Sequence, residues 1–278
     1  MYALKELENG FEYLEIKNSA ASAKIALQGA HIFSFKRSDA KELLWLSSVS
    51  AFEMGSAIRG GIPLCWPRFG NLDKSLPQHG FARTAAFELV SVQEESDKLT
   101  TVHLRLKSSD ESKKVWDCEF VLDVIFHISE SLEVEMITSN KDTKEFLITQ
   151  AFHTYFQVSD IQNIKIVGLE NKPYLDTLIN KEEVQKGSIR IDKEVDRIYK
   201  ESAEDIVLED GERAVHIKAE NSASVIVWNP WIEKCSKMSG MEVDGYKRFV
   251  CIESANALDD FRMVAPNERI SIGVKYFI

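Results

Sequence analysis

The chain contains the run Ile58-Arg59-Gly60-Gly61-Ile62-Pro63-Leu64-Cys65-Trp66-Pro67-Arg68-Phe69-Gly70, followed closely by Gln78-His79-Gly80-Phe81-Ala82-Arg83. Three of the six prolines and five of the thirteen glycines lie between residues 54 and 86. Proline removes a backbone donor and glycine adds chain entropy, so this region cannot continue a helix or a central strand. Because it is also rich in aromatic residues, we expect an ordered, buried loop that lies close to a ligand.

The charge of this loop differs from that of the rest of the chain. It holds four cationic residues, Arg59, Arg68, Lys74 and Arg83, and one acid, Asp73, whereas the whole chain has a net charge of −10. A positive region on an acidic protein predicts a small anionic ligand. The pI of about 5.2 argues against nucleic acid as a partner, because neutralising its phosphates requires a basic face.

Length and composition indicate one soluble globular domain over residues 1–278. All-β sandwiches often reach this size as a single domain, and no break in composition divides the chain. The cysteines, Cys65, Cys118, Cys235 and Cys251, form no C-x-x-C pair, which argues against a disulfide framework and a zinc site and favours buried, reduced thiols. The N-terminal residues do not resemble a signal peptide, and no apolar run approaches the ~18 residues of a membrane span. We therefore expect a cytoplasmic monomer that does not bind a membrane.

Alternation of apolar and polar residues with a period of two dominates the chain and predicts β-strands. The expected strands are 23–27, 31–35, 43–46, 87–92, 101–107, 120–128, 132–138, 146–156, 164–169, 214–219, 225–228 and 270–276. Only 232–238 and 255–260 suggest a turn or two of helix, and the charged segment 181–204 is interpreted as a long connection that carries local structure. Many strands joined by polar turns predict an all-β protein, an antiparallel sandwich or barrel.

Three side chains are candidates for proton transfer. His79 lies in the glycine-rich loop, His153 follows an apolar strand among aromatic residues, and Glu253 follows four apolar residues. Burial would raise the pKa of Glu253 and make it a stronger base, and a histidine at a strand end suits proton transfer near neutral pH. The alternatives are that His153 is a structural histidine of the core and that Glu253 pairs with an arginine. The other four histidines are expected at half-buried or solvated structural positions.

Sequence motifs for other chemistries are absent. The chain has no G-x-S-x-G elbow, Walker loop, Rossmann fingerprint or H-E-x-x-H motif. Two histidines and a glutamate could in principle bind non-haem iron. Such sites usually take two ligands from one strand, whereas His79, His153 and Glu253 are far apart in the sequence, so this alternative is disfavoured.

Five motifs follow one another along the chain: Arg59-Gly60-Gly61-Ile62-Pro63-x-Cys65-Trp66-Pro67-x-Phe69-Gly70, His79-Gly80-Phe81-Ala82-Arg83, His153-Thr154-Tyr155-Phe156, Val227-Trp228-Asn229-Pro230-Trp231 and Glu253-Ser254-x-Asn256. Together they resemble the hexose-6-phosphate mutarotases, or glucose-6-phosphate 1-epimerases, of the galactose mutarotase-like superfamily. The first two motifs are specific in combination. The resemblance implies a large antiparallel β-sandwich, the galactose mutarotase-like supersandwich.

The resemblance also implies an activity and a set of site residues. His153 would be the general acid and Glu253 the general base in opening and closing the ring of a hexose 6-phosphate, which interconverts its α and β anomers. Arg59, Gln78, Arg83 and Asp196 would hold the phosphosugar, and His79 would polarise the ring. The reaction would need no metal and no organic cofactor.

Two other functions remain open at this level. An aldose 1-epimerase would act on unphosphorylated sugars, but a neutral sugar has no use for the converging guanidinium groups of Arg59 and Arg83. A carbohydrate-binding sandwich without catalysis would not need both His153 and Glu253. Finding those two side chains on opposite sides of one pocket would favour an enzyme.

Overall fold

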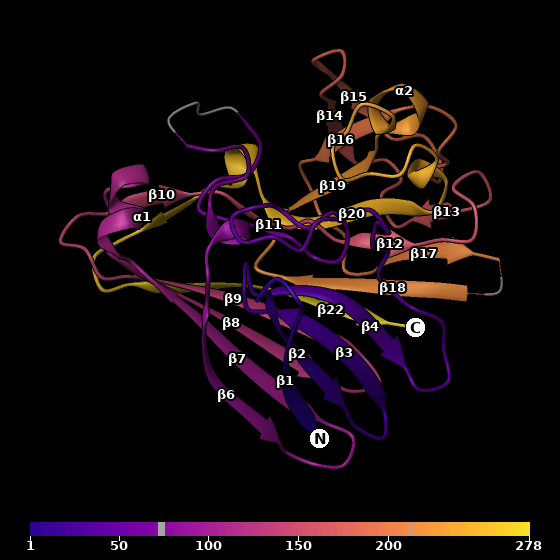
Figure 1. The fold of residues 1–278 in the computed structure, drawn as a ribbon. Helices are drawn as coiled ribbons and strands as arrows, with labels where there is room; N and C mark the ends of the chain where they lie inside the picture. Colours follow the sequence, from indigo (N-terminus) through magenta and orange to yellow (C-terminus); the bar gives the residue numbers. More distant parts are fainter. Residues whose placement is uncertain (72–75, 212) are drawn as a thin grey trace.

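The computed structural model describes residues 1–71, 76–211 and 213–278, and it consists almost entirely of antiparallel strands (Figure 1). Two eight-stranded sheets are accompanied by one sheet of four strands and one of two. The predicted all-β, antiparallel class is confirmed. Asp73 and Lys74, which contribute to the predicted charge of the loop, lie outside the described residues.

The first large sheet, called the β20 sheet here, carries the candidate site. Its strand order is β15 (Lys181–Val184), β14 (Pro173–Asp176), β16 (Val195–Tyr199), β19 (Ser224–Asn229), β20 (Phe249–Asn256), β11 (Gln150–Phe152) and β5 (Leu64–Cys65), with β12 (Tyr155–Gln157) also paired to β20. The second, the β9 sheet, has the order β13 (Lys165–Val167), β17 (Ile206–Asp210), β18 (Arg213–Glu220), β22 (Arg269–Phe277), β9 (Leu132–Asn140), β8 (Phe120–Ile128), β7 (Thr100–Lys107) and β6 (Glu88–Glu94).

The smaller elements complete the fold. They are the sheet of β1 (Tyr2–Glu6), β2 (Glu12–Lys17), β3 (Ala21–Ala26) and β4 (His31–Arg37), the pair β10 (Phe146–Ile148) and β21 (Arg262–Val264), the helices α1 (Asp110–Val115) and α2 (Trp231–Cys235), and 3₁₀ turns at Ala82–Thr84, Gly245–Lys247 and Leu258–Asp260. No helix among the described residues is long and apolar enough to cross a membrane.

Some expected elements differ from the structure. Residues 43–46 form only isolated bridges, and residues 146–156 divide into β10, β11 and β12 because the chain leaves β21 to pair with β20. The segment 181–204 carries local structure, as expected, but one of its two strands, β16, lies in the interior of the β20 sheet. Residues 255–260, expected to be helical, form the end of β20 and a 3₁₀ turn. Helix α1 was not expected from the sequence, and it begins at a capping box between Ser109 and Ser112.

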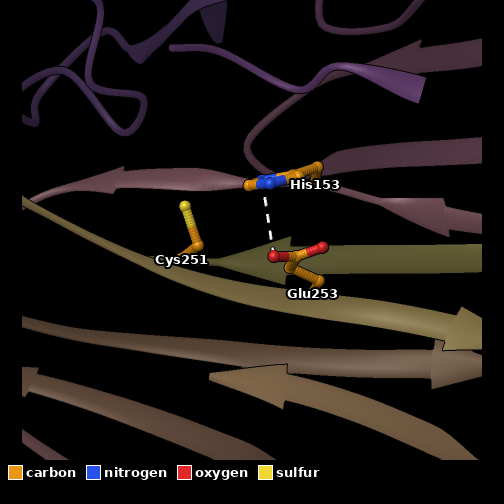
Figure 2. A group of neighbouring side chains, drawn as sticks. All are labelled: His153, Cys251 and Glu253. Carbon is orange, nitrogen blue, oxygen red and sulfur yellow. Dashed lines mark ion pairs between the residues drawn. The ribbon is translucent and has the colours of Figure 1, made fainter. Parts of the chain in front are cut away.

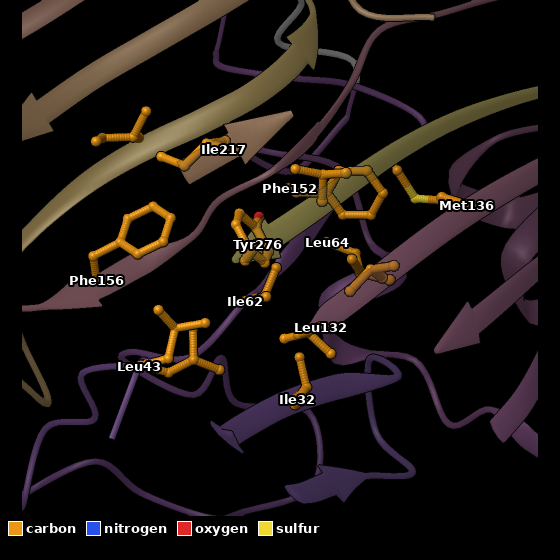
Figure 3. Packing of buried hydrophobic residues seen from close by; sticks show 14 of the residues in the cluster. Ile32, Leu43, Ile62, Leu64, Leu132, Met136, Phe152, Phe156, Ile217 and Tyr276 are labelled. Atoms are coloured by element: carbon orange, nitrogen blue, oxygen red, sulfur yellow. The ribbon is translucent and has the colours of Figure 1, made fainter. Parts of the chain in front are cut away.

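The core lies between the sheets. Figure 3 shows Ile32 of β4, Leu132 of β9, Phe152 of β11 and Tyr276 of β22 packed together, and each is fully buried. Burying one such side chain contributes roughly 1.5–3 kcal/mol. We infer that residues 1–278 form one domain, because this single cluster draws side chains from the four-stranded sheet and from both large sheets.

Strand β20 is buried on both faces, which explains its apolar sequence. Val250 and Ile252 belong to the core between the sheets, whereas Phe249 and Cys251 belong to a second cluster on the opposite face. Since side chains alternate along a strand, Glu253 lies on the same face as Phe249 and Cys251. The position of Glu253 in an apolar run therefore reflects a strand enclosed on two sides.

The glycine-rich loop packs its backbone directly on neighbouring chain segments. A Cβ at Gly60 would lie 2.3 Å from the Trp45 carbonyl oxygen, and a Cβ at Gly80 would lie 2.1 Å from that of Trp66. Both glycines also have positive φ, at 116° and 71°. The described parts of the loop, residues 54–71 and 76–86, are thus ordered by close backbone contact, as the sequence predicted.

Candidate functional site

One pocket gathers all of the residues predicted to form the site. Its volume is about 850 Å³, and its lining includes Arg59, Gln78, His79, Arg83, His153, Asp196 and Glu253. These residues come from the glycine-rich loop, the segment between β11 and β12, and strands β16 and β20. Residues almost 200 positions apart in the sequence therefore line the same cavity.

The register of the β20 sheet brings the distant residues together. Asp196 of β16 lies opposite Trp228 of β19, which lies opposite Cys251 of β20, which in turn lies opposite Tyr155 of β12. Glu253 is two residues from Cys251 and shares its face. A row of side chains thus crosses the sheet beneath the pocket, and strand pairing alone places Asp196 there.

His153 and Glu253 are immediate neighbours. His153 Nδ1 lies 3.4 Å from Glu253 Oε1, as the dashed line in Figure 2 marks. The two side chains thus converge on one pocket, as expected for a pair that acts on one sugar ring, but they lie side by side and not on opposite sides of it. They are adjacent because the chain between β11 and β12 runs along β20, to which both of these short strands are paired.

Burial sets the charge of this pair. The exposed fraction of Glu253 is 2% and that of His153 is 9%. Burial, with a smaller effect of the Asp196 charge, raises the pKa of Glu253 well above its usual range. Burial, together with His79 and Arg83, lowers the pKa of His153 well below 6.5. No arginine forms an ion pair with Glu253 within the described part of the chain, so the predicted alternative of a Glu–Arg pair is not observed.

His79 is held in one tautomer. The backbone N–H of Gly70 donates a hydrogen bond to His79 Nδ1 at 3.2 Å, and Cys65 Sγ contacts the same nitrogen at 3.3 Å. Because Nδ1 accepts, the proton of the neutral ring is on Nε2. Burial, with the charges of Arg83 and Arg59, lowers the pKa of His79 to about 3. His79 is thus suited to donate a hydrogen bond as a neutral ring.

Arg59 and Arg83 of the loop line the pocket, and each donates to a backbone carbonyl. Arg59 Nε donates to the carbonyl of Ser239 at 3.1 Å, and Arg83 Nη2 donates to the carbonyl of Gln78 at 2.7 Å. Over residues 1–71, 76–211 and 213–278, neither arginine has a carboxylate within 4.0 Å. Arg68 also lines the pocket and donates to the carbonyl of Leu147 at 2.5 Å. Positive charge therefore faces the cavity.

Two lining residues were not assigned a role from the sequence. Lys234 of α2 lies 3.9 Å from Asp196 and 5.9 Å from the ring centre of Trp228, and it pairs with Glu194 at 2.9 Å. Trp228 packs edge-on against the ring of His153. Trp228 lies within a motif that supported the resemblance, whereas Lys234 lies in an ordinary amphipathic turn and has no sequence signal of its own.

The four remaining histidines do not line the pocket, and the cysteines form no disulfide. His31 is not half-buried as expected but fully buried, and its Nε2 contacts the carbonyl of Gly60 at 2.8 Å. The other three, His103, His127 and His216, are half-buried as expected. All four cysteines are free thiols, and only Cys118 is not fully buried.

Comparison with known proteins places this pocket in a family. A profile described as "Aldose 1-epimerase" matches residues 12–276. A protein of Escherichia coli K12 named "Putative glucose-6-phosphate 1-epimerase" is 35% identical over 88% of this chain and 83% of its own length. A protein of the same name from Salmonella typhimurium LT2 is 34% identical over the same shares of the two chains.

A solved structure extends the comparison to the fold. The crystal structure of a "putative mutarotase" from Salmonella typhimurium matches with a TM-score of 0.93 at 31% identity, and covers 99% of this chain and 92% of that one. The galactose mutarotase-like sandwich expected from the resemblance is thereby confirmed. The profile, the relatives and the fold together show that this chain belongs to the aldose 1-epimerase family and is a sugar epimerase.

Proposed function

We propose that the protein interconverts the α and β anomers of a hexose 6-phosphate, with glucose 6-phosphate as the substrate. The observation that carries this proposal is the pair Arg59 and Arg83, which line the pocket of His153 and Glu253 and have no carboxylate partner among the described residues. The names of the Escherichia coli and Salmonella typhimurium relatives support the same substrate.

A phosphate would satisfy the arginines. Removing a phosphate from water costs several kcal/mol unless charge-assisted hydrogen bonds replace its hydration. The guanidinium groups offer planar, paired donors that match phosphate oxygens. An uncharged sugar would leave Arg59 and Arg83 without an anion, so the lining favours a phosphosugar.

The pair of His153 and Glu253 would carry the proton transfers. With neutral His153 and protonated Glu253, moving one proton between them produces an imidazolium and a carboxylate without changing the number of protons held. The carboxylate then takes the proton of the anomeric hydroxyl, while His153 gives its proton to the ring oxygen. The bond between C1 and the ring oxygen breaks, and C1 becomes an aldehyde carbon.

Closure of the ring reverses these steps. Rotation about the C1–C2 bond presents the other face of the aldehyde, and the two side chains exchange roles as acid and base. The ring oxygen and the anomeric oxygen are both bonded to C1, so adjacent catalytic groups reach both. Each proton transfer contributes about 10²–10⁴ in rate. His79 would donate a hydrogen bond through Nε2, and Gln78 and Asp196 would bind sugar hydroxyls.

The second candidate is an aldose 1-epimerase that acts on unphosphorylated sugars. The description of the matching family profile favours it, since that description names no phosphate. A carbohydrate-binding sandwich without catalysis is disfavoured. Glu253 Oε2 and His153 Nδ1 are buried without hydrogen-bond partners, and this costs free energy that a protein without catalysis has no reason to spend.

Magnetisation-transfer NMR distinguishes these possibilities. Exchange between the two anomer signals would be measured for glucose 6-phosphate and for glucose, with and without protein. We expect the protein to accelerate exchange of the phosphosugar much more than that of glucose. Equal acceleration would favour the aldose 1-epimerase, and no acceleration of either would contradict both.

A further inference from the structure

A thiol lies beside the two proposed catalytic groups. A ring nitrogen of His153, Sγ of Cys251 and a carboxylate oxygen of Glu253 all lie within 4.8 Å of one another. Figure 2 shows the three side chains around one small space, with Cys251 and Glu253 extending from β20 toward the ring of His153. The acid–base chemistry proposed above uses the imidazole and the carboxylate but not the thiol.

Two atoms of this group lack the partners that buried polar atoms usually have. His153 Nδ1 and Glu253 Oε2 are buried and have no hydrogen-bond partner. The other carboxylate oxygen, Glu253 Oε1, lies 3.4 Å from His153 Nδ1. The sulfur of Cys251 is buried as well, and its side chain is fully enclosed. A buried nitrogen and a buried oxygen without hydrogen-bond partners, close to a buried sulfur, are what a cation site requires.

The spacing fits a tetrahedral ion. With ligand bonds of about 2.0–2.1 Å to nitrogen and oxygen, a tetrahedral zinc site separates these two atoms by roughly 3.4 Å. The observed distance between His153 Nδ1 and Glu253 Oε1 is 3.4 Å. A sulfur at about 2.3 Å from zinc lies roughly 3.6 Å from each of the others. Since the three ligand atoms lie within 4.8 Å of one another, Cys251 Sγ needs a movement of about 1 Å to reach this separation.

We propose that His153, Cys251 and Glu253 bind a thiophilic divalent cation such as Zn²⁺. The imidazole, thiolate and carboxylate form a ligand set that zinc prefers, and the fourth position opens to the pocket, which both His153 and Glu253 line. Binding replaces the S–H bond of Cys251 by a metal–sulfur bond, and its proton, with any proton on Glu253, passes to the buffer. Mg²⁺ prefers oxygen ligands and is not expected to bind.

The bound ion would inhibit the enzyme. It would occupy the lone pair of His153 and the carboxylate of Glu253, so neither group could exchange protons with a sugar. This consequence rests on the proposed roles of the two residues, whereas binding of the ion does not. A sugar in the pocket and the ion would compete for the same atoms.

Binding is tested without substrate. Co²⁺ and Zn²⁺ would be titrated into the protein, with the sulfur-to-cobalt charge-transfer absorption and calorimetry as readouts. We expect one site per chain whose charge-transfer band disappears in Cys251→Ser, with affinity for Zn²⁺ weakened at least tenfold. Cys235→Ser is the matched control, because Cys235 is also a buried thiol but does not line the pocket. Its Sγ donates a hydrogen bond of 3.2 Å to the carbonyl of Glu242.

Inhibition is tested by anomer exchange on the same proteins. We expect Zn²⁺ to inhibit the wild type and Cys235→Ser, and Cys251→Ser to remain active and to need at least tenfold more Zn²⁺. Chelation of Zn²⁺ by the phosphosugar is the same in all three mixtures and cancels. Cys251→Ala serves as the second variant if the serine variant melts early.

The outcomes separate the two proposals. Equal metal affinity in wild type and Cys251→Ser, or no binding of Zn²⁺ at all, would overturn the metal site. Binding through Cys251 without inhibition would support the site and contradict the catalytic roles of His153 and Glu253. Inhibition by Mg²⁺ at the same concentration would also contradict a site built on sulfur.

Discussion

The imidazole of His153 and the carboxyl group of Glu253 lie side by side in a buried setting, with Nδ1 and Oε1 3.4 Å apart. Tyr155 stacks on the imidazole with ring centres 5.0 Å apart and an angle of 9° between the rings. The rings of Trp228 and His79 pack edge-on against the imidazole, with ring centres 5.7 and 5.5 Å from its centre. The imidazole is therefore held in one orientation against the carboxyl group, as proton exchange between them requires.

Removing either member of this pair should abolish most turnover. His153→Ala and Glu253→Gln are each expected to lower kcat about 10²–10⁴-fold with little change in KM, because both act on charge that develops in the transition state. His216→Ala is the control, since His216 is a half-buried histidine on β18, outside the pocket lining. Near-wild-type kcat in one of the pocket variants would remove that residue from the mechanism.

Arg83→Ala should discriminate between phosphorylated and free sugars. A charge-assisted hydrogen bond to a buried ion contributes about 1.5–3 kcal/mol, so kcat/KM for glucose 6-phosphate should fall roughly ten- to a hundredfold. The loss for glucose should be much smaller, and Arg83→Lys should recover part of the phosphosugar activity. Arg83 also donates to the Gln78 carbonyl. Equal losses for both sugars would mean that Arg83 acts by shaping the loop.

The buried carboxyl group makes stability depend on pH. Burial raises the pKa of Glu253 above its usual value of 4.5. The folded state therefore holds this proton more tightly than the unfolded state, and the free energy of unfolding falls as pH rises above about 4.5 toward the raised pKa. Relative to wild type, Glu253→Gln should gain in Tm as pH is raised through this range. A Tm difference that does not vary with pH would contradict the shift.

Asp123 provides the opposite control. Burial works against its ionisation, but hydrogen bonds from Arg105 and His103 lower the pKa of Asp123 below 3.8. This stabilisation is present above the usual pKa and is lost as pH falls through the lowered value. Asp123→Asn should therefore be less stable than wild type at neutral pH, with a deficit that shrinks in acid. Thermal melts over the same pH series measure both variants.

A pair of glycine substitutions tests the packing of the loop. Gly80 and Gly70 have similar φ angles, 71° and 75°, but only at Gly80 would a Cβ meet backbone, with the Trp66 oxygen at 2.1 Å. Gly70→Ala should cost about 1–2 kcal/mol for the left-handed conformation, and Gly80→Ala should cost roughly 1–3 kcal/mol more for the clash. Urea unfolding measures both. Equal costs would show that the loop moves away without penalty.

The sequence by itself determined the fold class and much of the site. Apolar and polar residues alternate along a strand that has one face buried, and this pattern is local. The strand expected at 120–128 therefore has the same bounds as β8 (Phe120–Ile128) in the structure. Proline and glycine act through the backbone of their own segment, so the ordered loop was also predictable. An acid within an apolar run indicated that Glu253 is buried, because a strand enclosed on both faces needs apolar residues throughout.

Only the tertiary structure decided which of these groups meet. The charged segment around Asp196 did not look like an interior strand, because β16 is enclosed by β14 and β19 that come from elsewhere in the chain. Nothing in the sequence placed His153 next to Glu253 rather than across the pocket, or brought Cys251 beside them. Those distances depend on the pairing register of β12, β19 and β20, and register is a long-range property fixed when the sheets bury their shared core.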